Sequence, residues 1–411
     1  MSNMSRVAST FSCRQYFSFE AVPGSIAALD GLRGIAILLV LFRHGVRPFY
    51  DSREAAIGGF GWDLMTPMVN GWAGVDLFFV LSGFLVSHHI LKRWSAEFRF
   101  GELRDYLVKR ILRIVPAYYA WLFVVAGGLL PFYRVPASVV REQLWVHLLF
   151  LQDYVPSRIV VAFWSLGVEE KFYLSIPLLI VPVARMKSPA RRAALIALMT
   201  LVPLGLRALT YARHGAFEGY EDCFWTMRSP FHLALDSLLV GSLCAFLVRD
   251  RQAFGWLNRP ETPRRLLLAG TALVAALIGF KPLLNEINGF SSTLLFSLLA
   301  WGFGAVLLGL VLEPKRERPL LGSRAMLVLS KLSYSLYLVH MCFIGVTLSA
   351  VRTLPGFDNL PRGLQFLIYF PVFAVVSMLA AMALHFAVEK PFLVIKDSYG
   401  AALPRRAKVG V

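Results

Sequence analysis

Several apolar stretches long enough to cross a lipid bilayer constrain this chain more than any other feature. A membrane-spanning helix needs roughly 20 mostly apolar residues, and that length is reached at 266–284, 291–312, 326–351 and 364–388. Hydrophobic residues make up 57% of the 411 residues and charged residues only 16%. Within lipid every backbone polar group needs an internal partner, which helices provide. We predict an all-α, polytopic integral membrane protein.

The whole pattern predicts about ten transmembrane helices. The expected spans are residues 29–46, 72–91, 114–131, 164–184, 193–211, 230–248, 266–284, 291–312, 326–350 and 365–388. If the N-terminus is cytoplasmic, most of the 42 lysines and arginines fall in the cytoplasmic segments, as the positive-inside rule requires. Both termini are therefore expected in the cytoplasm. The net charge of +17 is then mainly a topology signal, and we expect no nucleic-acid partner.

No hydrophilic segment is long enough for a second soluble domain. We expect a cytoplasmic N-terminal segment at 1–28, a membrane domain at 29–391 and a basic cytoplasmic tail at 392–411 that is disordered from residue 396. The N-terminal segment lacks an apolar core of signal-peptide length, so the first span should be an uncleaved anchor. The four cysteines show no CxxC or metal-ligand spacing, so neither a disulfide framework nor a metal site is predicted.

The first span, LDGLRGIAILLVLFRH at 29–44, carries charges that the bilayer disfavours. Asp30, Arg33 and His44 lie on one face of a helix, over about 21 Å at 1.5 Å per residue. Charged groups inside a membrane are costly and are functional candidates by default. Two alternatives remain, because Asp30 and Arg33 suit a helix cap and a snorkelling side chain, and His44 suits a packing histidine. Arg43 is expected to face away from this stripe.

Other spans contain further polar groups. In the second span, Asp76 is our preferred orienting partner for a histidine, and Ser82 lies near mid-depth, in a Ser-Gly pair typical of close helix packing. In the fourth span, Glu169 is a candidate general base or substrate ligand. Lys171 is expected to form a structural pair with Glu170.

Arg110 and Arg113 share one helix face at the expected cytoplasmic boundary, just before Pro116. Paired guanidinium groups there suit a phosphorylated cytosolic ligand. The alternative is simple anchoring by positive charge.

The ordered set of motifs resembles the membrane-bound acyltransferase 3 family, bacterial enzymes that O-acylate glycans and antibiotics. The matching pieces are LDGLRGIAILLVLFRH (29–44), GWAGVDLFFVLSGFL (71–85), RILR (110–113), FWSLGVEEKFYL (163–174), DSLLVGSLCAF (236–246), LSYSLYLVH (332–340) and VEKPF (388–392). The family's fourth-span motif usually ends Glu-Glu-Gln, and here Lys171 replaces the glutamine. Many relatives carry an additional extracytoplasmic hydrolase-like domain, whereas only the membrane portion is expected here.

The resemblance implies transfer of an acyl group, most often acetyl, from cytosolic acyl-CoA to a hydroxyl of a glycan or glycosylated acceptor. By matching positions, His44 is the essential histidine, Arg33 its companion, and Arg110 and Arg113 the pair associated with acyl-CoA. The resemblance also implies the bacterial cytoplasmic (inner) membrane as the location.

Together these inferences define a hypothesis for the site. We expect catalytic roles for His44, Arg33, Asp76 and Glu169, and contacts to acyl-CoA from Arg110, Arg113 and Ser82, with no metal. His44 acts as general base or as acyl carrier, and the oxyanion donor is Ser82, Tyr337 or Arg33. The alternative function is a transporter or flippase of a lipid-linked glycan, and a third is a non-catalytic scaffold. The sequence specifies neither the acceptor nor the oligomeric state.

Overall fold

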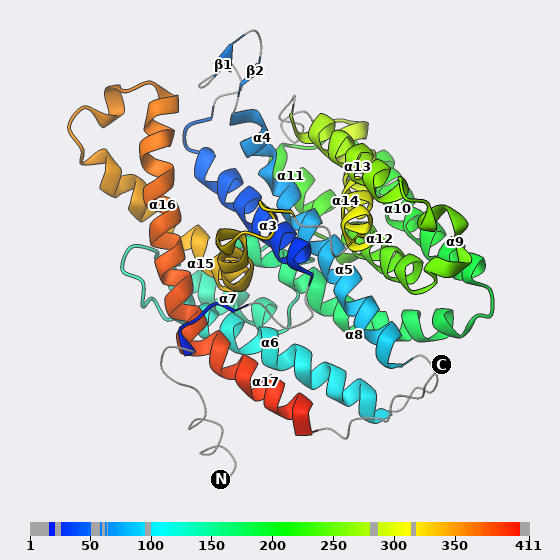
Figure 1. Ribbon diagram of the computed structural model, residues 1–411. Helices are drawn as coiled ribbons and strands as arrows, with labels where there is room; N and C mark the ends of the chain where they lie inside the picture. The colour runs from blue at the N-terminus through cyan, green and yellow to red at the C-terminus, as the bar shows by residue number, and fades with distance from the viewer. Residues whose placement is uncertain are drawn as a thin grey trace.

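Long helices dominate the structure of this protein, a computed structural model (Figure 1). It describes residues 16–20, 26–50, 58–59, 62–63, 65–94, 100–279, 287–313 and 318–402. The only strands in these ranges are β1 (Gly58–Gly59) and β2 (Trp62–Asp63), which form a two-residue antiparallel pair. The prediction of an all-α fold is confirmed. Most of the expected N-terminal segment and residues 403–411 of the expected tail lie outside the described residues.

Helices occupy all ten expected spans. They are α3 (Ala27–Val46), α5 (Ala73–Arg93), α6 (Phe100–Ala126), α8 (Trp164–Arg185), the consecutive α9 (Pro189–Met199) and α10 (Leu201–His214), α12 (Phe231–Arg249), α13 (Thr262–Gly279), α14 (Leu295–Val311), α15 (Arg324–Arg352) and α16 (Arg362–Leu384). Shorter helices are α4 (Met65–Val69), α7 (Ala137–Leu148), α11 (Tyr220–Cys223) and α17 (Lys390–Ala402). Single turns are η1 (Asn70–Trp72), η2 (Val161–Phe163), η3 (Phe224–Arg228), η4 (Arg251–Ala253), η5 (Gly255–Asn258), η6 (Phe290–Leu294), η7 (Phe357–Asn359) and η8 (His385–Glu389).

By length and composition, seven helical segments of the described chain are apolar enough to cross a membrane. Three long helices, α3, α6 and α8, are not among the seven, and every 18-residue window in each of them holds at least three charged residues. A polytopic membrane protein is confirmed. The cytoplasmic location of the two termini stays a prediction.

Small residues allow the central helices to approach closely. A Cβ atom on Gly83 of α5 would lie 2.0 Å from the carbonyl oxygen of Leu238, and one on Gly241 of α12 would lie 2.1 Å from that of Val80. The two helices therefore pack backbone against backbone, as small residues permit in membranes. This close approach accounts for the Ser-Gly pair at 82–83.

The predicted disorder from residue 396 is wrong for residues 396–402, which continue helix α17. This helix lies alongside α6, and the hydroxyl of Tyr399 donates to Asp105 at 2.7 Å (Figure 1). This packing brings the cationic side chain of Lys396, on α17, to a cavity that Arg110 and Arg113 of α6 also line.

Candidate active site

Three adjoining cavities lie in series through the helix bundle, and together they are called the route. We name them the basic mouth, the central cavity and the aromatic cavity. The basic mouth and the central cavity share Arg33, Ser82, Arg113 and Tyr173 as lining residues. The central and aromatic cavities share Val75 and Tyr337. Because α3 runs beside the whole route, Arg33 lines its first two parts and His44 its last.

The basic mouth carries far more positive than negative charge. Its ionised lining residues are Arg33, Lys109, Arg110, Arg113, Lys396 and Asp397. The guanidinium of Arg110 lies 5.6 Å from the ring centre of Tyr106 and 5.2 Å from that of Tyr173, which holds it by cation–π contacts. Burial, together with the neighbouring Arg93, lowers the pKa of Lys109. An anionic ligand would relieve this concentration of positive charge.

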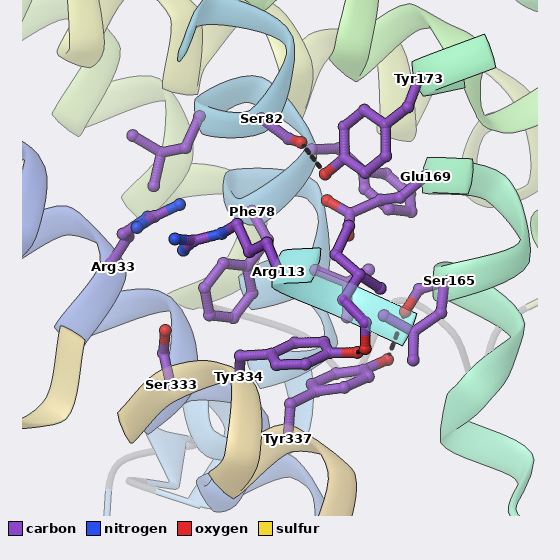
Figure 2. Close-up of a pocket in the computed structure, with 15 residues that line it drawn as sticks. Arg33, Phe78, Ser82, Arg113, Ser165, Glu169, Tyr173, Ser333, Tyr334 and Tyr337 are labelled. Atoms are coloured by element: carbon purple, nitrogen blue, oxygen red, sulfur yellow. Dashed lines mark hydrogen bonds between the residues drawn. The ribbon is translucent and has the colours of Figure 1, made fainter. Parts of the chain in front are cut away.

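In the central cavity, most of the predicted polar residues converge (Figure 2). Arg33 of α3 and Arg113 of α6 extend into it, and Glu169 of α8 lies across from them. The hydroxyls of Ser82 and Tyr173 are 2.6 Å apart. Helices far apart in sequence thus bring Arg33, Ser82, Arg113 and Glu169 to one cavity.

The aromatic cavity contains His44, whose ring contacts a second histidine from α15. His44 Nδ1 lies 3.0 Å from the carbonyl oxygen of Val40 and 3.1 Å from Nε2 of His340. His340 Nδ1 lies 2.8 Å from the carbonyl oxygen of Tyr337 and 3.2 Å from that of Leu336. Aromatic and polar side chains also line this cavity, including Trp72, Glu142, Gln143, Arg158, Trp164, Tyr220, Phe224 and Trp225.

These contacts specify the tautomers of both neutral rings. A carbonyl oxygen only accepts hydrogen bonds, so Nδ1 of His340 carries its proton and Nε2 is left as an acceptor. Nδ1 of His44 must then donate, to His340 and to Val40. The remaining nitrogen of His44, Nε2, therefore has a free lone pair, which is the form that a general base requires.

Asp76 does not orient this histidine. Its carboxylate accepts two hydrogen bonds from the guanidinium of Arg228, at 2.8 and 2.7 Å, and one from Ser237 at 3.2 Å. Asp76 is 1% exposed and Arg228 6%, so each neutralises a charge that would otherwise be buried alone. The expected histidine–aspartate contact is thus replaced by His44–His340 and Asp76–Arg228.

Lys171 also has a different partner from the one expected. Its ammonium donates to Asp153 Oδ1 at 2.6 Å and to the carbonyl oxygen of Phe150 at 2.5 Å, and Asp153 is fully buried. The lysine that replaces the family's glutamine is therefore matched by a carboxylate before α8, and Glu170 has no bond to it.

Sequence reasoning also misplaced or missed three side chains of the route. Arg43 does not face away, because it is 8% exposed, lines the aromatic cavity and donates to the carbonyl oxygen of Val69 at 3.0 Å. The sequence predicts a disordered tail at Lys396, whereas this residue lies on α17 and lines the basic mouth. His340 belongs to the quoted motif LSYSLYLVH, and its position as the last polar residue of that motif was the available signal.

No metal-binding group of three or more His, Cys, Asp or Glu side chains occurs in the described part of the chain. The chemical resources of the route are therefore a histidine pair, hydroxyls, carboxylates and an excess of cations. Such a set is suited to moving a proton and stabilising anions.

Comparison with known proteins gives several bacterial relatives. The chain is 31% identical over 205 residues to the putative peptidoglycan O-acetyltransferase YrhL of Bacillus subtilis, covering 46% of this chain and 29% of the relative. It is 25% identical over 350 residues to the peptidoglycan O-acetyltransferase OatA of Listeria monocytogenes, covering 78% and 50%. A putative O-acetyltransferase of Staphylococcus aureus is 25% identical over 246 residues, covering 57% and 36%.

The chain thus spans half or less of the length of each of these relatives. No solved structure matches it. The profile of a family described as an acyltransferase domain matches residues 26–386, which is most of the chain and includes all three cavities except their lining residues on α17. This protein therefore belongs to the acyltransferase 3 family.

Proposed function

We propose that this protein is a membrane O-acyltransferase that moves an acyl group, acetyl in the first instance, from acyl-CoA to a hydroxyl of a glycan. The observation that carries the proposal is the series of adjoining cavities from a cation-rich mouth to a histidine with a free lone pair. Family membership supports acyl transfer, and the names of the relatives support acetyl as the group and peptidoglycan as one candidate acceptor.

The donor enters at the basic mouth in this proposal. The phosphates of acyl-CoA are held by Arg110, Arg113, Lys109 and Lys396, since charge-assisted hydrogen bonds to phosphate are strong. The thioester end then extends along α3, past Arg33 towards His44. These two residues are eleven positions apart, about 16 Å along a helix. The positive mouth faces the cytoplasm, where acyl-CoA is found, in agreement with the positive-inside prediction.

The acceptor enters from the other end. A sugar ring exposes C–H groups on its faces and hydroxyls around its edge. The aromatic cavity presents both the apolar ring faces and the polar side chains that such a ligand requires. On this basis the acceptor side is extracytoplasmic, and the protein lies in the bacterial cytoplasmic membrane.

In direct transfer, Nε2 of His44 accepts the proton of the acceptor hydroxyl while its oxygen attacks the thioester carbonyl. The C–O bond forms, the C–S bond breaks, and the CoA thiolate takes the proton from the imidazolium. His340 accepts a hydrogen bond from Nδ1 of His44 throughout, so it is a positioning residue. Positioned proton transfer of this kind gives about 10²–10⁴-fold in rate.

A covalent route is the other way to connect the two substrates. The acyl group would first be transferred to Nε2 of His44 with release of CoA, and the acceptor hydroxyl would then attack the acyl-imidazole. Rapid mixing with labelled acetyl-CoA alone, followed by acid quench, separates the routes. Label on His44 supports the covalent route, and its absence supports direct transfer.

The decisive experiment is mass spectrometry of surface glycans from cells with and without the gene. We expect a set of glycan species heavier by one acyl group only where the gene is present, which would also identify the group and the acceptor. The His44→Ala variant, inserted in the membrane at the wild-type level, should abolish these species. Acylation that persists in that variant would refute His44 as base or carrier, and a flippase would instead change the amount of glycan without changing its mass.

A further inference from the structure

Few residues lie at the boundary between the central cavity and the aromatic cavity. Among the lining residues that the structure describes, only Val75 of α5 and Tyr337 of α15 belong to both cavities. Valine has no polar atom, so Tyr337 is the polar side chain at the point where donor and acceptor sides meet. Its position raises the question of what holds it there.

The phenol of Tyr337 is fastened by its hydroxyl. The hydroxyl donates to the carbonyl oxygen of Ala162 at 2.6 Å. It lies 2.6 Å from Oγ of Ser165, which donates to it in turn (Figure 2). Phe78 of α5 meets the ring edge to face, with centroids 6.5 Å apart. The side chain is only 6% exposed. The ring is thus fixed between α5 and the start of α8.

The backbone of the same residue contacts the histidine pair. Its carbonyl oxygen accepts the Nδ1 proton of His340 at 2.8 Å, and the two ring centres are 5.7 Å apart. The residue that divides the route therefore lies one helical turn from the residue that orients His44.

We propose that Tyr337 is a partition between the acyl-CoA side and the acceptor side, latched by its hydroxyl to Ala162 and Ser165, and that it turns aside for transfer. This inference rests on the proposed function for its purpose. A thioester that is open to a wet acceptor cavity containing a general base would be hydrolysed, and active sites suppress such side reactions by excluding water. The closed partition separates the thioester from that water until transfer.

The partition can be tested without measuring any activity. Ser333 lines the central cavity but not the aromatic cavity, so Ser333→Cys places a thiol behind Tyr337. A membrane-impermeant sulfonated methanethiosulfonate is applied to spheroplasts and, separately, to inverted vesicles, because its negative charge suits the cationic route. The same chain without Ser333→Cys gives the background from the native cysteines.

With Tyr337 present, we expect rapid labelling from the side of the basic mouth and slow labelling from the side of the aromatic cavity. Tyr337→Phe removes the latch but keeps the ring, and should raise the slow rate by about 5- to 150-fold, the population shift that two neutral hydrogen bonds support. Tyr337→Ala should make the two sides nearly equal. The matched control is Tyr334→Phe, because Tyr334 lines the central cavity alone and its hydroxyl donates to Ile114 at 2.8 Å.

Equal labelling from both sides with Tyr337 intact, or no change in Tyr337→Phe, would overturn the partition. A second measurement covers the case in which Tyr337→Ala is not inserted. Hydrolysis of acetyl-CoA without acceptor should rise several-fold in Tyr337→Phe and stay unchanged in Tyr334→Phe. If Ser333→Cys with Tyr337 intact shows one-sided labelling but the wild-type protein shows no acyl transfer, the proposed function fails while the partition stands.

Discussion

The contact between His44 and His340 leads to the most discriminating test of the site. Replacing His340 by leucine removes the acceptor 3.1 Å from Nδ1 of His44, whereas replacement by glutamine keeps a side-chain oxygen that can accept. If His340 is a positioning residue, the leucine variant should lose most of its turnover and the glutamine variant should recover part of it. A residue needed only for packing predicts no such difference.

The expected decrease in kcat follows from the role of the His44–His340 hydrogen bond during the reaction. When His44 takes up the acceptor proton, its Nδ1–H belongs to a cation, and a hydrogen bond from a charged group contributes about 1.5–3 kcal/mol. The neutral ring makes the same bond before transfer, where it contributes about 0.5–1.5 kcal/mol, so only the difference of about 1–1.5 kcal/mol acts on turnover. At 1.36 kcal/mol per tenfold, its loss lowers kcat by about 5- to 13-fold. The carbonyl oxygen of Val40, at 3.0 Å, remains as a second acceptor, so the tautomer survives. The loss should therefore not exceed the 10²–10⁴-fold expected from removing the base itself.

The assay is acyl transfer by protein reconstituted in vesicles, with kcat and KM determined for acetyl-CoA. Because His340 does not line the basic mouth, KM should stay within twofold, roughly the value of one weak hydrogen bond. His385→Leu is the matched control, since His385 is also a buried histidine but contacts Glu389 at 2.8 Å and not His44. Equal turnover in His340→Leu and wild type, or equal losses in His340→Leu and His385→Leu, would refute the positioning role.

The remaining predictions concern stability, measured as thermal unfolding of the purified protein in detergent. Asp76→Asn leaves the Arg228 guanidinium buried without a counter-charge and should lower the free energy of unfolding by about 3–5 kcal/mol. Adding Arg228→Gln should recover part of this loss. If the double variant is no more stable than Asp76→Asn, the pair is not the cause. Lys171→Gln restores the family's usual residue but leaves the buried carboxylate of Asp153 without its ammonium partner. It should lower the free energy of unfolding by about 1.5–3 kcal/mol. Adding Asp153→Asn should recover most of this loss, and a Lys171→Gln protein as stable as wild type would contradict the assignment. Burial lowers the pKa of His147 to about 4, compared with 6.5 in an unfolded chain. The stability that depends on neutral His147 is thus complete above pH 6.5 and is lost as the pH falls through 4, by at most about 3.4 kcal/mol. The slope of stability with pH over this interval should be smaller in His147→Gln, and an unchanged slope would show that other groups control it.

The membrane fold was predictable because it depends on local properties. A helix that crosses lipid must be about 20 residues long and mostly apolar, and each such stretch reports this without reference to the others. The convergence of Arg33, Arg113 and Glu169 was partly predictable too, since polar side chains on membrane helices face the interior of the bundle. The helix at 390–402 escaped prediction because its basic, weakly apolar sequence is stabilised by packing on α6.

The pairing of buried charges was not predictable, since it depends on which helices are neighbours. Asp76 and Arg228 are 152 residues apart, and His44 and His340 are 296 apart. From spacing alone, any buried carboxylate was an equally suitable partner for His44. Glycines at 83 and 241 allow α5 to pack closely on α12, and Arg228 of η3, the turn that precedes α12, pairs with Asp76 of α5. Asp76 is therefore not the partner of His44.

The three long helices that are least suited to lipid all contribute charged residues to the route. Windows of α3, α6 and α8 carry at least three charges each, and these helices supply Arg33 and His44, Arg110 and Arg113, and Glu169. A charge facing lipid at mid-membrane would cost about 2.5–3.5 kcal/mol, and the same charge facing a shared polar cavity avoids most of that cost. The charges therefore have to lie together, with apolar helices such as α13 and α14 around them. It follows that the location of the site can be inferred from where a span fails to be apolar, even though the partner of each charge cannot.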